Sequence, residues 1–238
     1  DRIAKLNDLL GGLPKSSPLL LKTEDHADGK SQTLTFEPEP GLQVTAKRDL
    51  TKSSDRLAVI LDVDSGAESA WSSDRAQTLR ADGWSVIAPE LRATGRTAVP
   101  RDTIASAVDH NSAEWAIWIG RPLIGQWVQD IRHTLDAVAE RDGRLPKEIQ
   151  VIGSGSSGIA ALFAGALDTR ITGVEMTKSI SSYITDTPYR GVRLGVMVPG
   201  ILRDVGDIAD VAALIAPRHL TIEGGTTGSG IPLDEQAL

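Results

Sequence analysis

Short runs of apolar residues alternate along this chain with segments of helical periodicity, and this order limits the choice of fold more than any other feature of the sequence. The apolar runs are 56–63, 84–88, 149–152, 171–176 and 219–222. The helical segments are 71–82, 126–140, 159–167 and 208–215. A strand that is apolar at consecutive positions is buried on both faces, as in parallel sheets covered by helices. We therefore predict an α/β fold with a mainly parallel sheet and helices on both faces.

The first part of the chain carries the pattern of an antiparallel hairpin. Apolar and polar residues alternate in 33–36 and 42–46 around a Glu-Pro-Glu-Pro-Gly turn, as expected for two half-buried strands. Residues 1–32 are predicted to form a short helix and a polar loop, and residues 33–238 to form the α/β domain, with a last helix that begins at Asp234. A length of 238 residues suits one domain of this class.

The composition excludes several classes of partner and chemistry. The net charge is −7 and the isoelectric point is near 5.1, so the chain has no field that would attract nucleic acid or anionic lipid. No apolar run reaches the ~18 residues of a membrane span. There is no cysteine, which rules out disulfides and thiolate chemistry. We expect neither a nucleic-acid partner nor a membrane span.

Residues 153–158, with the sequence Gly-Ser-Gly-Ser-Ser-Gly, connect a buried strand to an apolar helix. Small residues suit a place where strand and helix backbones pass close together, and the first amides of a helix can stabilise an anion or an oxyanion. The segment satisfies the dinucleotide-binding pattern G-x-G-x-x-G, with Glu175 in the next strand as a ribose-binding acid. It is equally compatible with a structural role, in which the small residues only let the helix pack on the sheet.

A third interpretation of this segment is a nucleophile elbow, whose usual form is Gly-x-Ser-x-Gly. An ungapped alignment of the flanking glycines puts Gly155 at the position of the nucleophilic serine and Ser157 at that of the following glycine. A shift by one residue makes Ser156 the nucleophile and puts Ser154 where the first glycine belongs. We predict an elbow-like turn with Ser156 as the nucleophile candidate. The other residues of the predicted turn are Gly153, Ser154, Gly155, Ser157 and Gly158.

Several other segments resemble bacterial α/β-hydrolases of the acetyl xylan esterase type, including their larger multidomain relatives. Residues 84–97 are similar to that group's strand followed by Asp-x-Arg-Gly-x-Gly, with Glu90 in place of the Asp and Ala93 in place of a Gly. Residues 119–130 resemble the segment that leads into the helix before the elbow. Further similar stretches are 166–171 and 207–218. As an ordered set these segments extend over roughly residues 33–235.

The resemblance implies an α/β-hydrolase fold and a serine ester hydrolase acting on an acylated polysaccharide or oligosaccharide without a cofactor. Such an enzyme uses Ser, Asp or Glu, and His in that chain order. In this fold the acid usually follows the strand predicted at 219–222, and the His follows one further strand. The loop 224–230 contains no carboxylate, and no further strand is predicted, so we expect a domain that lacks the final strand and helix. Glu175 is then the fallback for the acid, and the base histidine is unassigned.

The other residues with reactive side chains give weaker signals. The histidines at 26, 110, 133 and 219 are predicted to be exposed or structural, His133 because it falls on the polar side of its helix. Asp62 and Asp64 flank the end of a buried strand, but no His or Cys accompanies them, so no metal site is expected. The tryptophans at 115, 118 and 127 are predicted either to line a sugar-facing cleft or to pack in the interior.

These observations leave three functional predictions. The first is a carbohydrate-active ester hydrolase-like domain with a degenerate nucleophile elbow. The second is a non-catalytic hydrolase-fold module that binds a glycan or a protein partner. The third is a nucleotide-binding Rossmann-like domain. A secreted or periplasmic location is suggested by the resemblance alone.

Overall fold

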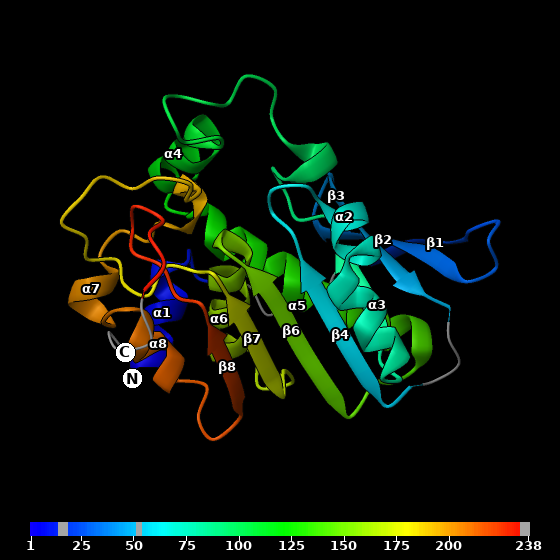
Figure 1. Ribbon diagram of the computed structural model, residues 1–238. Helices are drawn as coiled ribbons and strands as arrows, with labels where there is room; N and C mark the ends of the chain where they lie inside the picture. Colours follow the sequence, from blue (N-terminus) through cyan, green and yellow to red (C-terminus); the bar gives the residue numbers. More distant parts are fainter. Residues whose placement is uncertain (14–18, 51–53, 234–238) are drawn as a thin grey trace.

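The computed structural model describes residues 1–13, 19–50 and 54–233 of the chain. An eight-stranded sheet forms its centre, in the order β1-β2-β3-β5-β4-β6-β7-β8 (Figure 1). The strands are β1 (Leu19–Asp25), β2 (Ser31–Glu39), β3 (Leu42–Asp49), β4 (Arg56–Leu61), β5 (Ser85–Pro89), β6 (Glu148–Ser154), β7 (Gly173–Thr177) and β8 (His219–Glu223). Strands β1, β2 and β3 are antiparallel to their neighbours, and β5, β4, β6, β7 and β8 pair in parallel.

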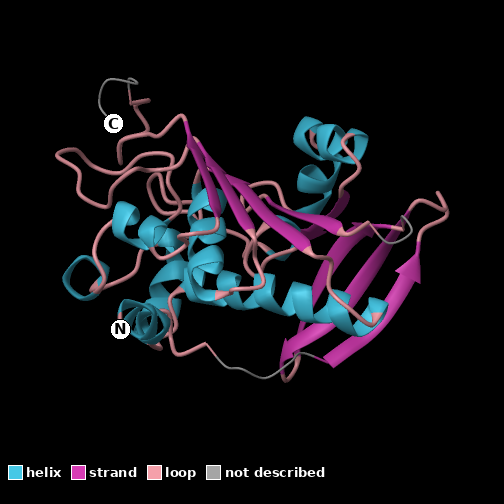
Figure 2. Cartoon of the chain, turned by 90° about the horizontal axis from the view of Figure 1, so that it is seen from below, coloured by secondary structure: helices cyan, strands magenta, loops and turns pink. Residues whose placement is uncertain are grey.

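Helices cover both faces of this sheet, as the cartoon in Figure 2 shows by the strands that separate two groups of helices. The α-helices are α1 (Arg2–Leu9), α2 (Ala67–Ser72), α3 (Asp74–Ala81), α4 (His110–Trp118), α5 (Leu123–Asp142), α6 (Ser156–Leu167), α7 (Ile201–Asp204) and α8 (Ile208–Ala213). Two short 3₁₀ turns are η1 (Gly95–Thr97) and η2 (Leu194–Val196). The longest helix, α5, ends where Gly143 takes the left-handed conformation with φ 74°, which glycine adopts without a Cβ penalty.

The two faces of the sheet bury different sets of side chains because successive residues of a strand point to opposite sides. In β4, Leu57, Val59 and Leu61 belong to a large core that also contains α1, α5, α6 and α8. Ala58 and Ile60 belong to a smaller core beneath α2 and α3. Burial on both faces explains why the parallel strands consist of continuous apolar runs. The predicted α/β fold with a mainly parallel sheet is confirmed.

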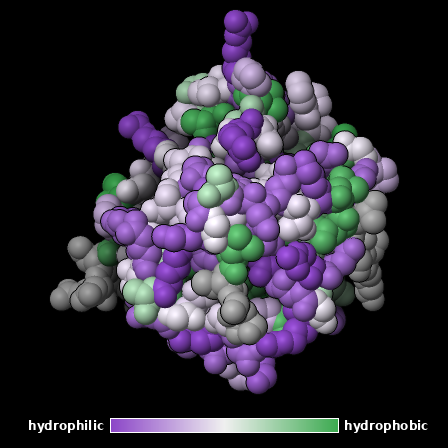
Figure 3. Space-filling view, turned by 90° about the vertical axis from the view of Figure 1, so that its right-hand side faces the viewer, coloured by the Kyte–Doolittle hydropathy of each residue, from purple (hydrophilic) through white to green (hydrophobic). Residues whose placement is uncertain are grey.

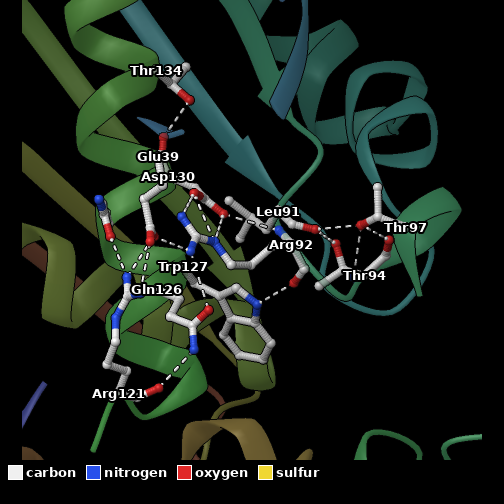
Figure 4. A network of polar contacts seen from close by, with 11 residues as sticks. Glu39, Leu91, Arg92, Thr94, Thr97, Arg121, Gln126, Trp127, Asp130 and Thr134 are labelled. Atoms are coloured by element: carbon white, nitrogen blue, oxygen red, sulfur yellow. Dashed lines mark hydrogen bonds and ion pairs between the residues drawn. The ribbon is translucent and has the colours of Figure 1, made fainter. Parts of the chain in front are cut away.

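A largely buried network of ion pairs and hydrogen bonds connects the antiparallel strands to α5 (Figure 4). Asp130 of α5 is fully buried and accepts hydrogen bonds from the backbone and guanidinium of Arg92, with Nη2 at 2.5 Å. The same guanidinium donates to Glu39 at the end of β2 at 2.6 Å, and Glu39 also binds Arg121. Hydrogen bonds from Arg121, together with Arg92, lower the pKa of Glu39 to about 2 despite partial burial. Since Arg92 follows β5, this network joins three separate parts of the sequence.

Several local predictions differ from the structure. Residues 19–25 form strand β1, although the sequence pattern indicated a loop there. The predicted helix 71–82 is divided at Ser73, whose hydroxyl accepts from the amide of Ala76 and starts a new helix. The prediction that His133 is solvated is wrong, since its side chain is buried. Helix α5 contacts β1, β2, β5, α4 and α6, so its polar side is covered as well.

Three further observations concern the C-terminal prediction, the helices and the surface. The helix predicted to begin at Asp234 lies outside the described residues. None of the helices in the described ranges has both the length and the apolar composition needed to cross a bilayer. The face shown in Figure 3 is predominantly hydrophilic, with hydrophobic residues in small separate groups.

Candidate active-site cleft at the turn between β6 and α6

The segment 153–158 makes the turn from β6 into α6 at the carboxyl end of β6. Strand β6 pairs with β4 on one side and β7 on the other. Strand β5 lies on one side of β4, and the next strand along the chain, β6, lies on the other side. The strand order therefore reverses between β4 and β6. In open α/β sheets, ligands bind outside the carboxyl ends of the strands at such a switch point. The turn therefore lies where a functional site is expected.

Gly155 is the apex of the turn. It holds φ 57° and ψ −125°, a conformation that residues with a side chain rarely adopt. A Cβ placed on Gly155 would meet no heavy atom of the described residues within 4 Å, so a side chain here would have room. At Gly153 the opposite holds, because a Cβ there would clash with the backbone of Ser157. The close approach of strand and helix thus requires glycine at 153, and the backbone angles favour it at 155.

The two serines that follow are the first residues of α6 and are both buried. The Ser156 side chain is 6% exposed, and its Oγ accepts a hydrogen bond of 3.1 Å from the backbone N–H of Arg193. The Ser157 Oγ accepts a hydrogen bond of 2.9 Å from the backbone N–H of Val63. The exposed serine of the turn is Ser154, the last residue of β6.

The loop between β4 and α2 lies beside the turn, and its amides are occupied within the chain. Val63 donates to Ser157, as described above. The amides of Asp64 and Ser65 donate to the Asp62 carboxylate at 3.0 and 2.8 Å, and the Gly66 amide donates to the Asp62 carbonyl at 3.0 Å. Four consecutive backbone donors of this loop, residues 63–66, are therefore engaged.

The segment 190–196 crosses the turn and is fixed by Arg193. Besides its amide bond to Ser156, Arg193 places its Nε 2.8 Å from Asp64 Oδ1 and its Nη1 3.8 Å from Asp109 Oδ2. The buried Asp109 carboxylate also accepts the amides of Leu194 and Gly195, each at 2.9 Å. Arg193 thus joins the β4–α2 loop, the start of α6 and the residues before α4 at one point. No sequence pattern singled out Arg193 or Asp109, because their partners are distant along the chain.

Two cavities open on either side of Gly155. One has a volume of about 490 Å³, and its wall includes Ser156, Lys178 and Arg190. The other has a volume of about 460 Å³ and is lined by Ser154, Asp62, Asp64, Arg75, Glu175 and Lys178. Lys178, which directly follows β7, borders both cavities and has a left-handed backbone with φ 50°.

Glu175 lies in the middle of β7 and faces α3. Its carboxylate binds the guanidinium of Arg75 through two contacts, of which the one from Nε to Oε1 measures 2.9 Å. A bidentate arginine pair holds a carboxylate firmly in position. The structure therefore gives Glu175 a partner in α3, and its predicted role as the acid of a triad stays a prediction.

The histidines are spread over the molecule. His26 contacts the hydroxyl of Thr33 at 2.8 Å in the β1–β2 hairpin. His110 begins α4 and lies 3.8 Å from Glu114. His219 is exposed and begins β8, so it lies at the amino edge of the parallel strands, opposite Gly155. The base that the resemblance requires is thus still unassigned.

The tryptophans separate into two groups. Trp127 is fully buried in α5, and its indole N–H donates to the carbonyl of Arg92 at 2.9 Å, so the interior role is confirmed for this residue. Trp115 and Trp118 of α4 are 56% and 72% exposed. They lie on the helix that contacts η2, next to the segment fixed by Arg193.

Comparison with known proteins agrees with this architecture. No family model and no curated protein matches the sequence. Among solved structures, a Bacteroides fragilis protein assigned as an acetyl xylan esterase superposes with a TM-score of 0.71 at 16% identity, over 94% of this chain and 66% of that one. A methylesterase superposes with a TM-score of 0.60 at 21% identity, over 94% of this chain and 49% of that one.

A glucuronoyl esterase of carbohydrate esterase family 15 from Caldicellulosiruptor kristjansonii superposes with a TM-score of 0.58 at 18% identity, over 96% of this chain and 70% of that one. The chain thus spans between about half and about two thirds of the length of these proteins. Identities this low establish the fold rather than the activity. By its sheet order, its turn after β6 and these superpositions, the chain has the α/β-hydrolase fold.

Proposed function

We propose that this chain is a carbohydrate-esterase-like domain that binds an acylated saccharide in the cleft around Gly155 and does not cleave it through a serine of the turn. The conformation of Gly155 carries this proposal. In α/β-hydrolases the nucleophile occupies the sharp apex of the strand-to-helix turn, from which its side chain projects over the sheet. Here the apex residue, with φ 57° and ψ −125°, has no side chain.

The surroundings of Gly155 support a binding role. A covalent acyl intermediate needs a nucleophile beside a general base, whereas the Ser156 hydroxyl is buried and accepts an amide from Arg193. An oxyanion hole in this fold uses the N–H that follows the nucleophile together with an N–H from the loop after an earlier strand. In this chain the β4–α2 loop corresponds to that loop, and its Val63 amide donates a hydrogen bond to the Ser157 hydroxyl. The Ser156 hydroxyl and the loop donor of the oxyanion hole are thus engaged in internal contacts.

The cleft retains features that suit an acylated sugar. Lys178 and Arg190 border the larger cavity, and the N-terminal amides of Ser156 and Ser157 have no acceptor within α6, because a helix leaves its first amides unpaired. Such donors match the hydroxyl and carbonyl oxygens of a saccharide ester. The proteins that share the fold are named as esterases of acetylated xylan, of methyl esters and of glucuronoyl esters.

The test combines a reactivity assay with a binding assay. We expect the purified chain to remain unlabelled by a fluorophosphonate probe, and we expect the wild type, Ser156→Ala and the control Ser154→Ala to hydrolyse an aryl acetate at the same background rate. Binding of acetylated xylo-oligosaccharides, measured by calorimetry, should weaken in Lys178→Glu and Arg190→Glu but not in the exposed control Arg203→Gln. Labelling that disappears in Ser156→Ala would contradict the proposal.

One observation favours a second candidate, an esterase that uses Ser156. This residue borders the 490 Å³ cavity directly beside Gly155, so a shift of the segment 190–196 would expose its hydroxyl. A rate of aryl acetate hydrolysis that falls in Ser156→Ala and is unchanged in Ser154→Ala would support this candidate. The nucleotide-binding interpretation of residues 153–158 is an untested prediction. Since Arg75 holds the carboxylate of Glu175, which that interpretation assigns to the ribose, we expect a calorimetric titration with NAD or FAD to produce no heat.

A further inference from the structure

A separate cavity lies at the edge of the sheet opposite Gly155, near the amino ends of β4 and β5. Its volume is about 360 Å³, and its walls include Gln32, Arg48, Ser85, Val138, Arg141 and Asp142. The strand register explains why three of these side chains meet. Gln32 of β2 is the cross-strand partner of Arg48 in β3, and Arg48 is in turn the partner of Ile87 in β5. Ser85 precedes Ile87 by two residues, so all of these side chains point to the face that α5 covers.

Polar atoms with no partner are concentrated in this cavity wall. Arg48 is 8% exposed, and its Nη2 binds Asp142 of α5 at 2.8 Å. Its Nε and Nη1 are buried and have no hydrogen-bond partner among the described residues, and the same holds for the hydroxyl of Ser85 and for Oε1 of Gln32. Buried polar groups are almost always paired in folded proteins, and an unpaired donor of a charged group is especially unfavourable. Four such atoms therefore lie in one cavity wall, where a polar ligand could pair with them.

The charges of the cavity favour a ligand with a negative group. Arg48, Arg141 and Arg144 contribute to its walls together with one carboxylate, Asp142. Arg144 is bound to Asp55 at 2.8 Å, which leaves two guanidinium groups facing the carboxylate and the negative end of α5. A partial positive charge remains, and it lies beside the unpaired Nε and Nη1 of Arg48. The Nε–H and the Nη1–H of Arg48 point to different sides of the guanidinium, so they can donate to separate oxygens of one polar ligand but not to one oxyanion as a parallel pair.

We propose that this cavity binds a small hydroxylated oxyanion of the sugar phosphate or sugar acid class. Nε and Nη1 of Arg48 donate to separate oxygens of the ligand, at least one of which is anionic. The Ser85 hydroxyl donates a further hydrogen bond to the ligand, and Oε1 of Gln32 accepts a hydrogen bond from one of its hydroxyls. A cavity of about 360 Å³ has room for a monosaccharide-sized molecule. The site is independent of the cleft at Gly155, because it lies at the other edge of the sheet and shares no residue with the two cavities there.

The test compares ligands that share the oxyanion but differ in its source. Glucose 6-phosphate, D-glucuronate and inorganic phosphate are titrated separately to about 20 mM at constant ionic strength, with sodium chloride as the reference, and the melting temperature and the heat of binding are measured. We expect glucose 6-phosphate or D-glucuronate to raise the melting temperature, and the stronger of the two identifies the oxyanion. Inorganic phosphate should bind more weakly than glucose 6-phosphate, because it lacks the hydroxyls that Gln32 accepts.

Two separate substitutions test the site, so that one of them remains informative if the other impairs folding. Arg48→Lys keeps a positive charge that can pair with Asp142 but loses the Nε and Nη1 donors, and Ser85→Ala removes only the hydroxyl; each is expected to weaken binding by about ten-fold or more. The matched control is Arg80→Lys, whose guanidinium binds Asp49 on the other face of the sheet. Absence of any shift or heat with all three ligands would overturn the proposal, as would affinity that is unchanged in both Arg48→Lys and Ser85→Ala.

Discussion

Ala93 shows how a single backbone angle connects the sequence pattern to the structure. The resemblance to acetyl xylan esterases places a glycine at this position, after the strand now seen as β5. Ala93 has φ 57°, a left-handed conformation in which a Cβ is crowded by the following carbonyl. It is followed by the turn η1, in which Gly95 lies against the side chain of Glu90. Ala93 therefore has a backbone conformation that glycine adopts without a Cβ penalty.

We predict that Ala93→Gly stabilises the protein. Relief of the left-handed alanine is worth roughly 1–2 kcal/mol, and it is opposed by greater freedom of the unfolded chain and by the loss of one half-buried methyl group, roughly 1 kcal/mol together. A net gain of about 0.5 kcal/mol should appear as a higher urea midpoint with an unchanged slope. The control is Ala98→Gly at φ −58°, where the same change should lower the midpoint. A lower midpoint for Ala93→Gly would show that the angle carries no strain.

The turn around Gly155 shows what sequence reasoning could reach at single residues. An ungapped alignment put Gly155 at the nucleophile position and Ser157 in place of a glycine, whereas a shift by one residue made Ser156 the nucleophile candidate; the observed backbone has its positive φ at Gly155. The alignment could not show that the Ser157 hydroxyl binds the amide of Val63, since the two residues are 94 positions apart. The role of a serine in such a turn depends on contacts of this kind rather than on the local pattern.

Among the elements, those predicted correctly are the ones whose own pattern reflects their burial. Strand β1 was missed because Lys22, Thr23, Glu24 and Asp25 are consecutive polar residues. Strand β1 lies at the edge of the sheet and is stabilised by its pairing with β2. Its own sequence has no alternation of apolar and polar residues that would indicate a strand. Helix α4 was missed for a related reason. Its first amides, of Asn111 and Ser112, bind the carboxylate of Asp102 nine and ten residues earlier, so its cap does not follow the usual local spacing.

The segment 190–196 is an element whose position depends on one carboxylate. Asp109 accepts the amides of Leu194 and Gly195 and lies near the guanidinium of Arg193. We predict that Asp109→Ala releases this segment from the cleft, because the amides of Leu194 and Gly195 lose their acceptor and the Arg193 guanidinium loses a nearby negative charge. Hydrogen bonds to charged groups contribute about 1.5–3 kcal/mol each, so local exchange should accelerate by at least about ten-fold. Hydrogen–deuterium exchange followed by mass spectrometry measures this in peptides that contain 190–196.

The exposed carboxylate Asp186 supplies the control for that experiment, because it precedes the same segment along the chain. Asp186→Ala should leave the exchange of 190–196 unchanged. If Asp109→Ala accelerates exchange equally throughout the protein, the carboxylate stabilises the fold as a whole, and the local role assigned to it is wrong. A release confined to 190–196 would also open access to Ser156, whose hydroxyl accepts the amide of Arg193.

At the scale of the whole molecule, the antiparallel strands and the parallel sheet share one core. Leu34 and Phe36 of β2 and Val44 of β3 pack in the same cluster as the apolar residues of α5 and α6. The ion network adds a polar connection at the same junction, where Arg92 joins Glu39 of β2 to Asp130 of α5. We therefore expect one cooperative unfolding transition, with equal midpoints by tryptophan fluorescence and far-UV circular dichroism.

The pair Arg92 and Asp130 tests this coupling most directly. Arg92→Leu leaves the fully buried Asp130 without its guanidinium partner, so we predict a loss of about 3–5 kcal/mol at neutral pH. Burial raises the pKa of Asp130, and Arg92 opposes that rise. In Arg92→Leu the guanidinium no longer opposes the burial that raises the pKa of Asp130, and only the backbone amide of residue 92 and the charge of His133 still lower it, so protonation relieves the defect. The destabilisation should be smallest in acid, below the unfolded-state pKa near 4, and should grow as the pH rises through the folded-state value.

The double variant Arg92→Leu/Asp130→Leu completes the thermodynamic cycle. Since it removes both charges together, it should recover most of the stability lost by either single variant, and its stability should lose the pH dependence of Arg92→Leu. Glu39 keeps Arg121 as a partner in every variant, so the cycle isolates the buried pair. Urea denaturation at several pH values provides the measurement. Additive losses, with no recovery in the double variant, would mean that the two residues stabilise the junction separately and that the network does not couple the antiparallel strands to α5.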